Sequence, residues 1–302
     1  MSCYRILYNP LASNQKGKEH AMALEKILGS ENCLFEDITQ IKNYYNFFSK
    51  LSSDDKVVIA GGDGTLNKFI NSTDKMKFKN DIYYFAAGSG NDFMRDIGED
   101  PHNPRLINKY LENLPTVEVN SSKYKFLNGI SYGIDGYCCE KGDEMRESSD
   151  SDKPINYTMI AIKGLLFYYK PTRAEITVDG KKYEFKNVWL APCMNGRFYG
   201  GGMMPAPSQD RLSCGTVSVM VMHCPSKLKT LAVFPSIFSG KHINHKSVVT
   251  VLKGKEITVS FDRPRTLQID GETIKNVKEY KAFAGGAEQN AENTAVDTKI
   301  KI

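Results

Sequence analysis

Apolar and polar residues alternate in blocks along the first third of the chain. Strand-like apolar runs cover Tyr4–Tyr8, Cys33–Phe35, Lys56–Ala60 and Ile82–Ala87. Residues 19–28 and 41–51 lie between these runs and place apolar side chains at helical spacing, and a further helix is predicted near residues 106–111. Strands separated by single helices are typical of parallel pairing. We therefore predict an N-terminal doubly wound α/β domain over residues 1–118.

The pattern changes after about residue 120, where short β-rich runs dominate. These runs cover residues 173–178, 182–185, 188–191, 216–222, 247–252, 256–261 and 266–270. Asp179-Gly180 predicts a hairpin between two of them, and Lys253-Gly254 predicts another turn. We therefore predict an antiparallel, β-rich and sandwich-like second domain over residues 119–284. A small, polar segment over residues 285–302 predicts a loose tail.

One segment of the second domain is unusually apolar. Residues 157–169 predict a helix that either packs on a sheet, walls a lipid pocket or docks at a membrane interface. The charged residues 143–153 before it predict a mobile loop. His242 and His245 have the spacing of two metal ligands on one helical turn, but no glutamate base or third ligand accompanies them. We predict that both histidines lie at the surface.

Composition narrows the class of protein. The chain has 302 residues, of which 41% are hydrophobic and 25% charged, as in ordinary soluble globular proteins. Its net charge of +5 is scattered, which argues against nucleic acid as a partner. A weak attraction to an anionic membrane and a merely solubilising surface both remain open. Seven cysteines without a Cys-x-x-Cys pair, and no signal-peptide pattern, predict a cytoplasmic protein with reduced thiols.

The candidate chemistry begins at Gly61-Gly62-Asp63-Gly64-Thr65, between an apolar strand and a helix-like run. A glycine turn lets backbone N–H groups approach an anion closely, and the helix N-terminus behind it adds partial positive charge. A second strand leads to Gly88-Ser89-Gly90-Asn91-Asp92. Turns after adjacent parallel strands meet at one edge of the sheet, where open α/β folds bind ligands. Neither turn matches the P-loop or the dinucleotide fingerprint.

These motifs resemble those of the diacylglycerol kinase and sphingosine kinase superfamily, in particular its bacterial lipid kinases. The resemblance rests on residues 61–67 and 88–95, on Asn9-Pro10, on the segments 126–129 and 133–136, on Gly200-Gly201-Gly202-Met203 and on Asp270-Gly271-Glu272. It implies a fold of the NAD kinase and diacylglycerol kinase type and an ATP-dependent kinase that phosphorylates a lipid hydroxyl. It also implies a peripheral contact with the membrane surface.

The predicted site has a nucleotide-binding part and a catalytic part. Thr65 and Ser89 offer hydroxyl donors to phosphate, and Asp63 and Asp92 offer oxygen ligands to a catalytic Mg²⁺. The resemblance adds Thr39 near the nucleotide and places Asp270-Gly271-Glu272 across a cleft from it. Either Asp270 or Glu272 is then the general base, with Asp270 slightly favoured. The complete set predicted to bind ATP is Asn9, Pro10, Thr39, Gly61, Gly62, Asp63, Gly64, Thr65, Asn67, Gly88, Ser89, Asn91 and Asp92.

One departure from the family pattern concerns a structural metal ion. Bacterial relatives carry an Asp-Asp-Gly segment after the triple glycine, whereas this chain has Asp210-Arg211-Leu212-Ser213-Cys214-Gly215. We expect that metal site to be absent or rebuilt around Asp210.

Three functions remain open from the sequence. The first is a lipid kinase, the second an NAD kinase-like enzyme, and the third a non-catalytic nucleotide-binding regulatory protein. The segment Gly88-Ser89-Gly90-Asn91-Asp92-Phe93 favours the lipid kinase, since NAD kinases normally carry an Asn-Glu pair there. The acceptor lipid and the oligomeric state, including a homodimer, remain open.

Overall fold

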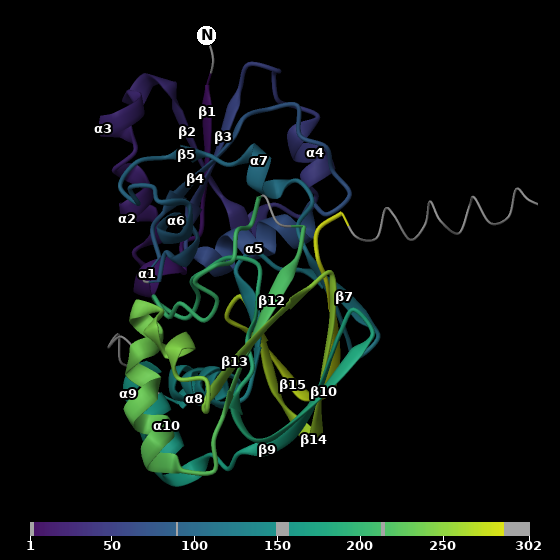
Figure 1. Ribbon diagram of the computed structural model, residues 1–302. Helices are drawn as coiled ribbons and strands as arrows, with labels where there is room; N and C mark the ends of the chain where they lie inside the picture. The colour runs from purple at the N-terminus through teal and green to yellow at the C-terminus, as the bar shows by residue number, and fades with distance from the viewer. Residues whose placement is uncertain (1–2, 89, 149–156, 213–214, 287–302) are drawn as a thin grey trace, which may run out of the picture. The chain divides into compact units, whose positions relative to one another are not determined.

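The computed structural model describes residues 3–88, 90–148, 157–212 and 215–286. The chain forms two compact units, Met1–Glu112 and Asn113–Ile302 (Figure 1). The strand Thr116–Val119 belongs to the second unit, because it pairs with a strand near the end of the chain. The predicted limits of the two domains, 1–118 and 119–284, and of the tail, 285–302, remain predictions. Residues 287–302 of the tail lie outside the described residues.

The first unit is built on a sheet in the order β2-β1-β3-β4-β5. Strands β2, β1, β3 and β4 are parallel, and β5 is antiparallel to β4. The elements are β1 (Tyr4–Tyr8), α1 (Ala12–Gln15), α2 (Gly17–Met22), α3 (Glu25–Leu28), η1 (Ser30–Asn32), β2 (Cys33–Asp37), η2 (Ile38–Gln40), α4 (Tyr44–Phe48), β3 (Lys56–Gly61), α5 (Asp63–Ser72), β4 (Ile82–Ala86), α6 (Asp92–Ile97), β5 (Arg105–Leu106) and α7 (Asn108–Leu111).

Helices cover both faces of this sheet. Ile6 and Leu7 are neighbours in β1 that point to opposite faces, and both are fully buried. Ile6 belongs to a core cluster with Ala21 and Leu24, next to the sheet. The continuous burial of β3 has the same cause, since a parallel strand between two helical layers has no solvated face. The predicted doubly wound α/β arrangement is confirmed.

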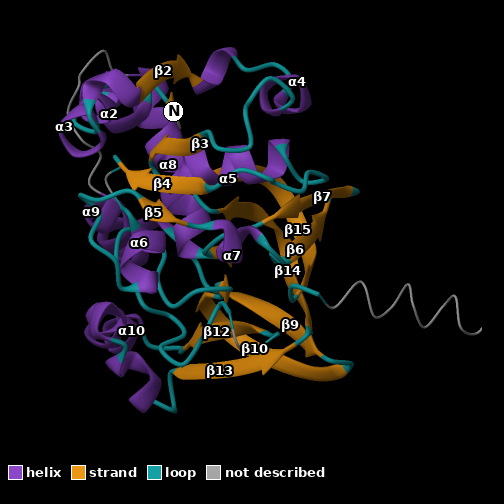
Figure 2. Cartoon of the chain, turned by 90° about the horizontal axis from the view of Figure 1, so that it is seen from above, coloured by secondary structure: helices purple, strands orange, loops and turns teal. Residues whose placement is uncertain are grey.

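The second unit contains an antiparallel sheet that closes on itself. The strand order is β7-β6-β15-β14-β8-β11-β12-β10-β9, with β13 beside β12 and with β9 returning to pair with β14 (Figure 2). The elements are β6 (Thr116–Val119), β7 (Ser122–Lys125), β8 (Gly129–Tyr132), α8 (Ile134–Ser148), α9 (Tyr157–Lys163), η3 (Gly164–Tyr168), β9 (Thr172–Val178), β10 (Lys181–Leu190), β11 (Cys193–Met194), β12 (Val217–His223), α10 (Lys227–Val233), η4 (Phe234–Ser239), η5 (Lys241–Asn244), β13 (Val249–Gly254), β14 (Glu256–Ile269) and β15 (Glu272–Phe283).

A layer of helices covers one side of this sheet. Its core contains Trp189 and Met220 from the strands together with Ile134, Ala161 and Phe234 from the helical segments. Trp189 is about 1% exposed and its indole N–H donates to the carbonyl of Cys224, so this large side chain is both buried and satisfied. The predicted β-rich second domain is therefore confirmed. No helix among the described residues is long and apolar enough to cross a bilayer.

Two local predictions for this unit are wrong. Residues 143–148 are not a loop, because α8 continues to Ser148; the Asp143 carboxylate accepts a hydrogen bond from the Thr273 hydroxyl at 2.8 Å, which ties this face of the helix to β15. His242 is not at the surface but fully buried, with its Nε2 atom 3.0 Å from the carbonyl oxygen of Pro205. His245 is exposed, as predicted.

Candidate functional site

The carboxyl ends of the parallel strands bring the predicted nucleotide-binding residues to one edge of the first unit. Tyr8, the last residue of β1, is in register with Asp37 of β2 and with Ala60 of β3. Gly61 at the end of β3 is in register with Ala86 of β4. Gly61 is the last residue of β3, and the segments that begin at Asn9, Thr39, Gly62 and Gly88 start directly after a strand end or within two residues of it. The parallel register therefore places them at the same edge.

The two glycine turns touch through their backbones. A Cβ atom built on Gly88 would lie 2.5 Å from the Cα atom of Gly62, closer than real contacts allow. A Cβ atom on Gly61 would lie 2.7 Å from the Thr65 side chain. Glycine is therefore required here by close approach rather than by an unusual φ. The sequence motif encodes a packing constraint between two turns that are about 26 residues apart.

Asp63 joins the same two turns through its carboxylate. Its Oδ2 accepts a hydrogen bond from the Asp92 N–H at 2.8 Å, and its Oδ1 accepts a longer one from the Phe93 N–H at 3.4 Å. The Tyr84 hydroxyl lies 3.4 Å from Oδ1. Asp63 starts α5, yet these bonds satisfy the first N–H groups of α6. The carboxylate thus fixes the second turn from the first.

Asn9 connects the end of β1 to this arrangement. Its side-chain N–H donates to the Thr65 hydroxyl at 3.0 Å, and its Oδ1 accepts from the Leu11 N–H at 3.0 Å. Gly17 lies against the other side of Asn9, because a Cβ atom there would come within 1.8 Å of the Asn9 carbonyl oxygen. Sequence reasoning missed Gly17. Gly17 stands between Lys16 and Lys18 in the sequence, and nothing in this local pattern predicts that its backbone lies so close to Asn9.

The remaining predicted residues of this unit have different surroundings. Asn91 adopts a left-handed φ of 51° and accepts a hydrogen bond from the Gly88 N–H at 3.2 Å, which closes the second turn. Asp92 is about 3% exposed, and Asn67 is also buried. The Thr39 side chain is exposed and donates to Asp37 at 2.7 Å. Ser89 lies outside the described residues.

The predicted catalytic segment of the second unit forms a tight hairpin turn. Asp270 and Gly271 connect β14 to β15, and both have positive φ, 47° and 93°, as a two-residue turn of this type requires. The Asp270 carboxylate accepts three backbone hydrogen bonds, from Leu127, from Asn128 at 2.8 Å and from Gly129 at 2.9 Å. Asp270 therefore anchors the segment that leads into β8. Glu272 is exposed at the start of β15.

Two further residues hold the same segment and were missed by sequence reasoning. Asn195 donates from its side chain to the Leu127 carbonyl at 2.9 Å. Arg211 donates to the Leu127 carbonyl at 3.1 Å and to the Asn128 side chain at 3.0 Å. Their sequence distance from Asn128, more than 60 residues in each case, left no local signal of the contact.

Two family models match the chain along most of its length. The model described as the diacylglycerol kinase catalytic domain matches residues 4–120. The model described as the YegS C-terminal NAD kinase beta sandwich-like domain matches residues 128–284, more than half of the chain. The chain belongs to the diacylglycerol kinase family. This family contains bacterial lipid kinases, so the resemblance seen in the motifs is confirmed.

Similar proteins match this chain over most of its length. A Bacillus subtilis (strain 168) protein named "Putative lipid kinase YtlR" is 24% identical, over 91% of this chain and 94% of the relative. A Bacillus subtilis (strain 168) protein named diacylglycerol kinase is 22% identical, over 89% of each. The crystal structure titled "a putative diacylglycerol kinase from Bacillus anthracis str. Sterne" has a TM-score of 0.65 and 18% identity, over 94% of this chain and 93% of that one. The structural likeness confirms the fold.

The second unit of this diacylglycerol kinase family member also has a buried polar cluster around Asp135. Asp135 lies in the first turn of α8. Its Oδ2 accepts a hydrogen bond from the Tyr199 hydroxyl at 3.1 Å, and its Oδ1 accepts one from the Gly136 N–H at 3.0 Å. Burial raises the pKa of Asp135 from 3.8 to about 7. Gln268, near the end of β14, also faces this carboxyl group. In the sequence, Asp135 belongs to the motif at residues 133–136, which predicts no role for this carboxyl group.

The proposed structural metal site is not supported by a donor cluster. Among the residues that the structure describes, no group of three or more His, Cys, Asp or Glu side chains could hold a metal ion. The exposed Asp210 carboxylate accepts a hydrogen bond from the Leu212 N–H at 2.9 Å. Ser213 and Cys214 lie outside the described residues. The role of Asp210 as a ligand remains a prediction.

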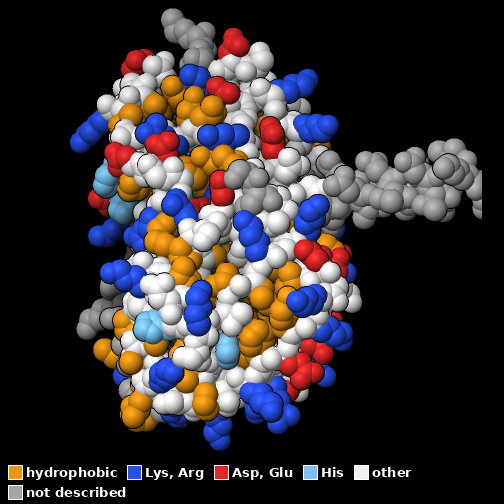
Figure 3. All heavy atoms as spheres, viewed as in Figure 1, with side chains coloured by type: hydrophobic (Ala, Val, Ile, Leu, Met, Phe, Trp, Pro, Cys, Tyr) orange, Lys and Arg blue, Asp and Glu red, His pale blue; other side chains and the backbone are white. Residues whose placement is uncertain are grey.

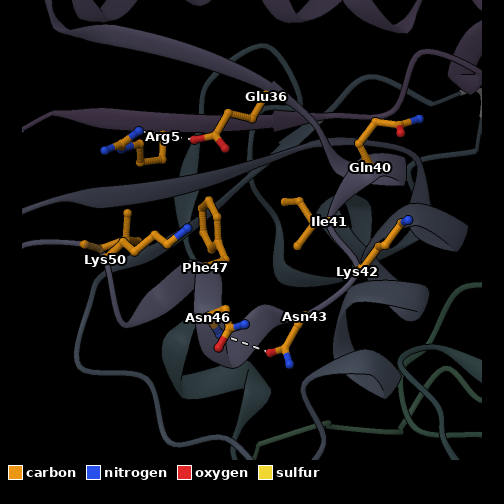
Figure 4. Close-up of a pocket in the computed structure, with 10 residues that line it drawn as sticks. Arg5, Glu36, Gln40, Ile41, Lys42, Asn43, Asn46, Phe47 and Lys50 are labelled. Atoms are coloured by element: carbon orange, nitrogen blue, oxygen red, sulfur yellow. Dashed lines mark hydrogen bonds and ion pairs between the residues drawn. The ribbon is translucent and has the colours of Figure 1, made fainter.

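A separate pocket lies on the α4 side of the first unit. It has a volume of about 400 Å³, and Figure 4 shows Phe47 and Lys50 on one side of it and the Arg5–Glu36 ion pair on another. Gln40 at its rim is next to Thr39 in the sequence. None of the residues predicted to bind ATP lines this pocket. It is therefore not formed by the glycine turns.

Proposed function

We propose that this protein is an ATP-dependent lipid kinase that transfers the γ-phosphate of ATP to a hydroxyl group of diacylglycerol or a related lipid. The observation that carries the proposal is the union of the two glycine turns, in which Gly88 lies against Gly62 and Asp63 binds the Asp92 N–H. Backbone of this kind can present N–H groups to phosphate with no side chain in the way. Membership of a lipid kinase family supports the class of acceptor.

The first unit would bind the phosphate donor. Phosphoryl transfer depends mainly on positioning the phosphates and neutralising their charge. The N-terminus of the ten-residue helix α5 lies directly behind Gly62 and contributes partial positive charge. Asn9 orients the Thr65 hydroxyl at the same edge. Both features support phosphate binding at this position.

Magnesium fits this site best as an ion that arrives with the nucleotide. The Asp63 carboxylate already accepts backbone N–H groups, and Asp92 is about 3% exposed. Such a pair suits an ion that is bound mainly by ATP phosphates and water and takes only one or two protein oxygens. When bound, Mg²⁺ would neutralise charge on the transferred phosphate. Asp63 and Asp92 are the residues that would hold it.

The second unit would supply the base that accepts the proton of the lipid hydroxyl. The Asp270 carboxylate accepts backbone N–H groups at both oxygens, two at Oδ1 and one at Oδ2, so it is already engaged in holding the Leu127–Gly129 segment. Glu272 is exposed two residues further on. These contacts support a positioning role for Asp270 and make Glu272 the stronger candidate for the base.

The cellular setting follows from the proposed acceptor. Diacylglycerol and similar lipids reside in bilayers, so the enzyme would work in the cytoplasm with a peripheral contact to the membrane surface. A non-membrane acceptor such as NAD⁺ would make no such demand.

The test is transfer of labelled γ-phosphate from ATP with Mg²⁺. Diacylglycerol and other lipids would be offered in mixed micelles, and NAD⁺ would be offered in parallel. We expect label in an organic-extractable lipid, loss of transfer in Glu272→Gln, and normal transfer in the control Asp262→Asn, an exposed position on β14. Label on NAD⁺ alone would establish an NAD kinase-like enzyme instead. ATP binding without transfer to any acceptor would favour a nucleotide-binding regulatory protein.

A further inference from the structure

Three large apolar side chains of the helical layer are exposed in the second unit. Phe167 and Tyr168 of η3 are 71% and 67% exposed, and Leu228 of α10 is 77% exposed. Helix α10 packs against η3, so these exposed side chains come from neighbouring segments. Figure 3 shows hydrophobic and basic side chains, and no acidic side chain among them, over the part of the second unit where α10 lies. Exposed apolar patches of this kind usually mark an interaction surface.

The backbone around η3 holds Phe167 and Tyr168 outward. The turn is π-helical, closed by a hydrogen bond of 2.7 Å from the Tyr169 N–H to the Gly164 carbonyl. Tyr169 points inward and is about 3% exposed, with the Arg265 guanidinium 5.0 Å from its ring centre. The buried ring fixes the end of the turn, so the two preceding aromatic side chains face solvent. Such π-helical turns are common at functional sites.

The charge around this surface has one sign. Residues 157–174 and 211–255 contain no aspartate or glutamate, but together they contain ten lysines and arginines. The rest of the chain therefore has 30 basic residues against all 35 acidic ones, so the positive net charge of the protein comes from these two segments. The exposed lysines near these apolar side chains include Lys163 of α9, Lys170 just after η3, and Lys227 and Lys229 of α10.

Acidic side chains of the neighbouring helix α8 are engaged elsewhere. Glu140 accepts a hydrogen bond from the Thr266 hydroxyl at 2.6 Å, and Asp143 accepts one from Thr273. Both partners belong to the β14–β15 side of the helix. Glu144 forms an ion pair of 2.5 Å with Lys141, on the same helix. These three carboxylates of α8 therefore do little to offset the positive charge of α9 and α10.

We propose that this surface docks on an anionic phospholipid bilayer. We call it the basic aromatic face and define it as Lys163, Phe167, Tyr168, Lys170, Lys227, Leu228 and Lys229. Aromatic and aliphatic side chains enter the interfacial region of a bilayer, while lysines attract acidic head groups. A symmetric contact between two copies is disfavoured, because it would set the same lysines against each other. The inference rests on the proposed function, in which the acceptor is a membrane lipid.

The test is sedimentation of the full-length protein with vesicles. Vesicles of phosphatidylcholine alone would be compared with vesicles that also contain phosphatidylglycerol. We expect binding only to the anionic vesicles, and a loss of about tenfold or more in the double variant Phe167→Ser, Tyr168→Ser. The matched control is Tyr45→Ser, which removes an aromatic side chain that is 59% exposed in the first unit. An equal loss in this control would contradict the proposal.

A second pair of variants tests the charge. Lys227→Glu with Lys229→Glu should weaken binding by about tenfold or more, whereas Lys181→Glu with Lys278→Glu, exposed lysines on β10 and β15, should change it little. Equal effects of both pairs would mean a non-specific attraction and would overturn the assignment. The assignment would also be overturned if sedimentation velocity showed a dimer that dissociates in the Phe167→Ser, Tyr168→Ser variant.

Transfer assays separate this inference from the proposed function. The Phe167→Ser, Tyr168→Ser variant should keep normal transfer to a short-chain diacylglycerol in detergent micelles and lose transfer to lipid in anionic vesicles. Vesicle binding that is unchanged in the variant overturns the docking surface even if the kinase is active. Vesicle binding that depends on the basic aromatic face, without transfer to any lipid, supports the surface and contradicts only the kinase.

Discussion

The Asp63 carboxylate accepts the backbone N–H of Asp92, with 2.8 Å between Oδ2 and the nitrogen. This hydrogen bond crosses from the first glycine turn to the start of α6. It lies next to the contact of Gly88 with Gly62, so the two turns are joined by one side chain and by their own backbones. A residue that sequence motifs suggest as a metal ligand is thus also the structural link of the site.

Replacing Asp63 by asparagine should lower both stability and transfer. The amide side chain has only one acceptor oxygen, and its NH₂ group would face backbone N–H groups. We expect a loss of about 1–3 kcal/mol in the free energy of unfolding and at least about a tenfold fall in kcat/KM. Urea unfolding and the lipid transfer assay measure these effects. Asp54→Asn, at an exposed position in the same unit, should change neither.

Replacing Gly88 by alanine should disrupt the contact between the two glycine turns by steric overlap. The new methyl group would meet the Cα atom of Gly62 at 2.5 Å, and backbone on that side cannot rotate away as a flexible side chain can. We expect a loss of about 1–3 kcal/mol in the free energy of unfolding, and weaker ATP binding. Isothermal titration with an ATP analogue would measure the binding. Gly98→Ala is the control: its φ of 72° makes it strained, but its Cβ would meet nothing within 4 Å, so it should affect stability alone.

The buried carboxyl group of Asp135 should make stability depend on pH. Burial raises its pKa from 3.8 to about 7, so the folded protein binds the proton more tightly than the unfolded chain does. The stabilising contribution of the neutral form is complete below about pH 4 and is lost as pH rises through about 7. The slope approaches about 1.4 kcal/mol per pH unit at its steepest.

Urea unfolding from pH 5 to pH 8 would show this dependence. In Asp135→Asn, which keeps a neutral acceptor for the Tyr199 hydroxyl, the decline with rising pH should be smaller. The variant should therefore gain stability relative to the original protein as pH increases. Asp262→Asn, on an exposed stretch of β14, should leave the profile unchanged. Parallel profiles for the original protein and Asp135→Asn would refute the assignment.

Local sequence signals predicted those parts of the molecule that local geometry decides. The Asp179-Gly180 turn has φ of 47° and 82°, the two positive values that its residues favour. The two glycine motifs predicted adjacent turns because parallel strands end at a common edge. The sequence predicts two separate runs, residues 256–261 and 266–270, where the structure has the single strand β14. The break between the two runs coincides with a shift in the pairing of β14 with β15, between Ser260 and Arg265.

Contacts between distant segments could not be predicted in the same way. The burial of His242 depends on a carbonyl group 37 residues earlier, which the spacing of the two histidines does not reveal. The partners of Asp270 lie more than 140 residues before it, and only the resemblance to a family drew attention to that turn. The predicted roles of Asp270 and Glu272 in catalysis likewise come from the family motif, and the transfer assay decides them.

Arg211 should hold the Leu127–Asn128 segment without the help of a metal ion. Its guanidinium donates to the Leu127 carbonyl and to the Asn128 side chain, and a charged donor of this kind contributes about 1.5–3 kcal/mol. Arg211→Ala should therefore lower the free energy of unfolding by about that amount, and Arg211→Lys should recover only part of it, because an ammonium group lacks the planar fork. The control is Arg263→Ala, whose side chain is about half exposed on β14. Adding EDTA should leave the Tm of the original protein unchanged. A Tm that falls with EDTA and recovers with Mg²⁺ would show that a metal ion, rather than Arg211, stabilises this segment.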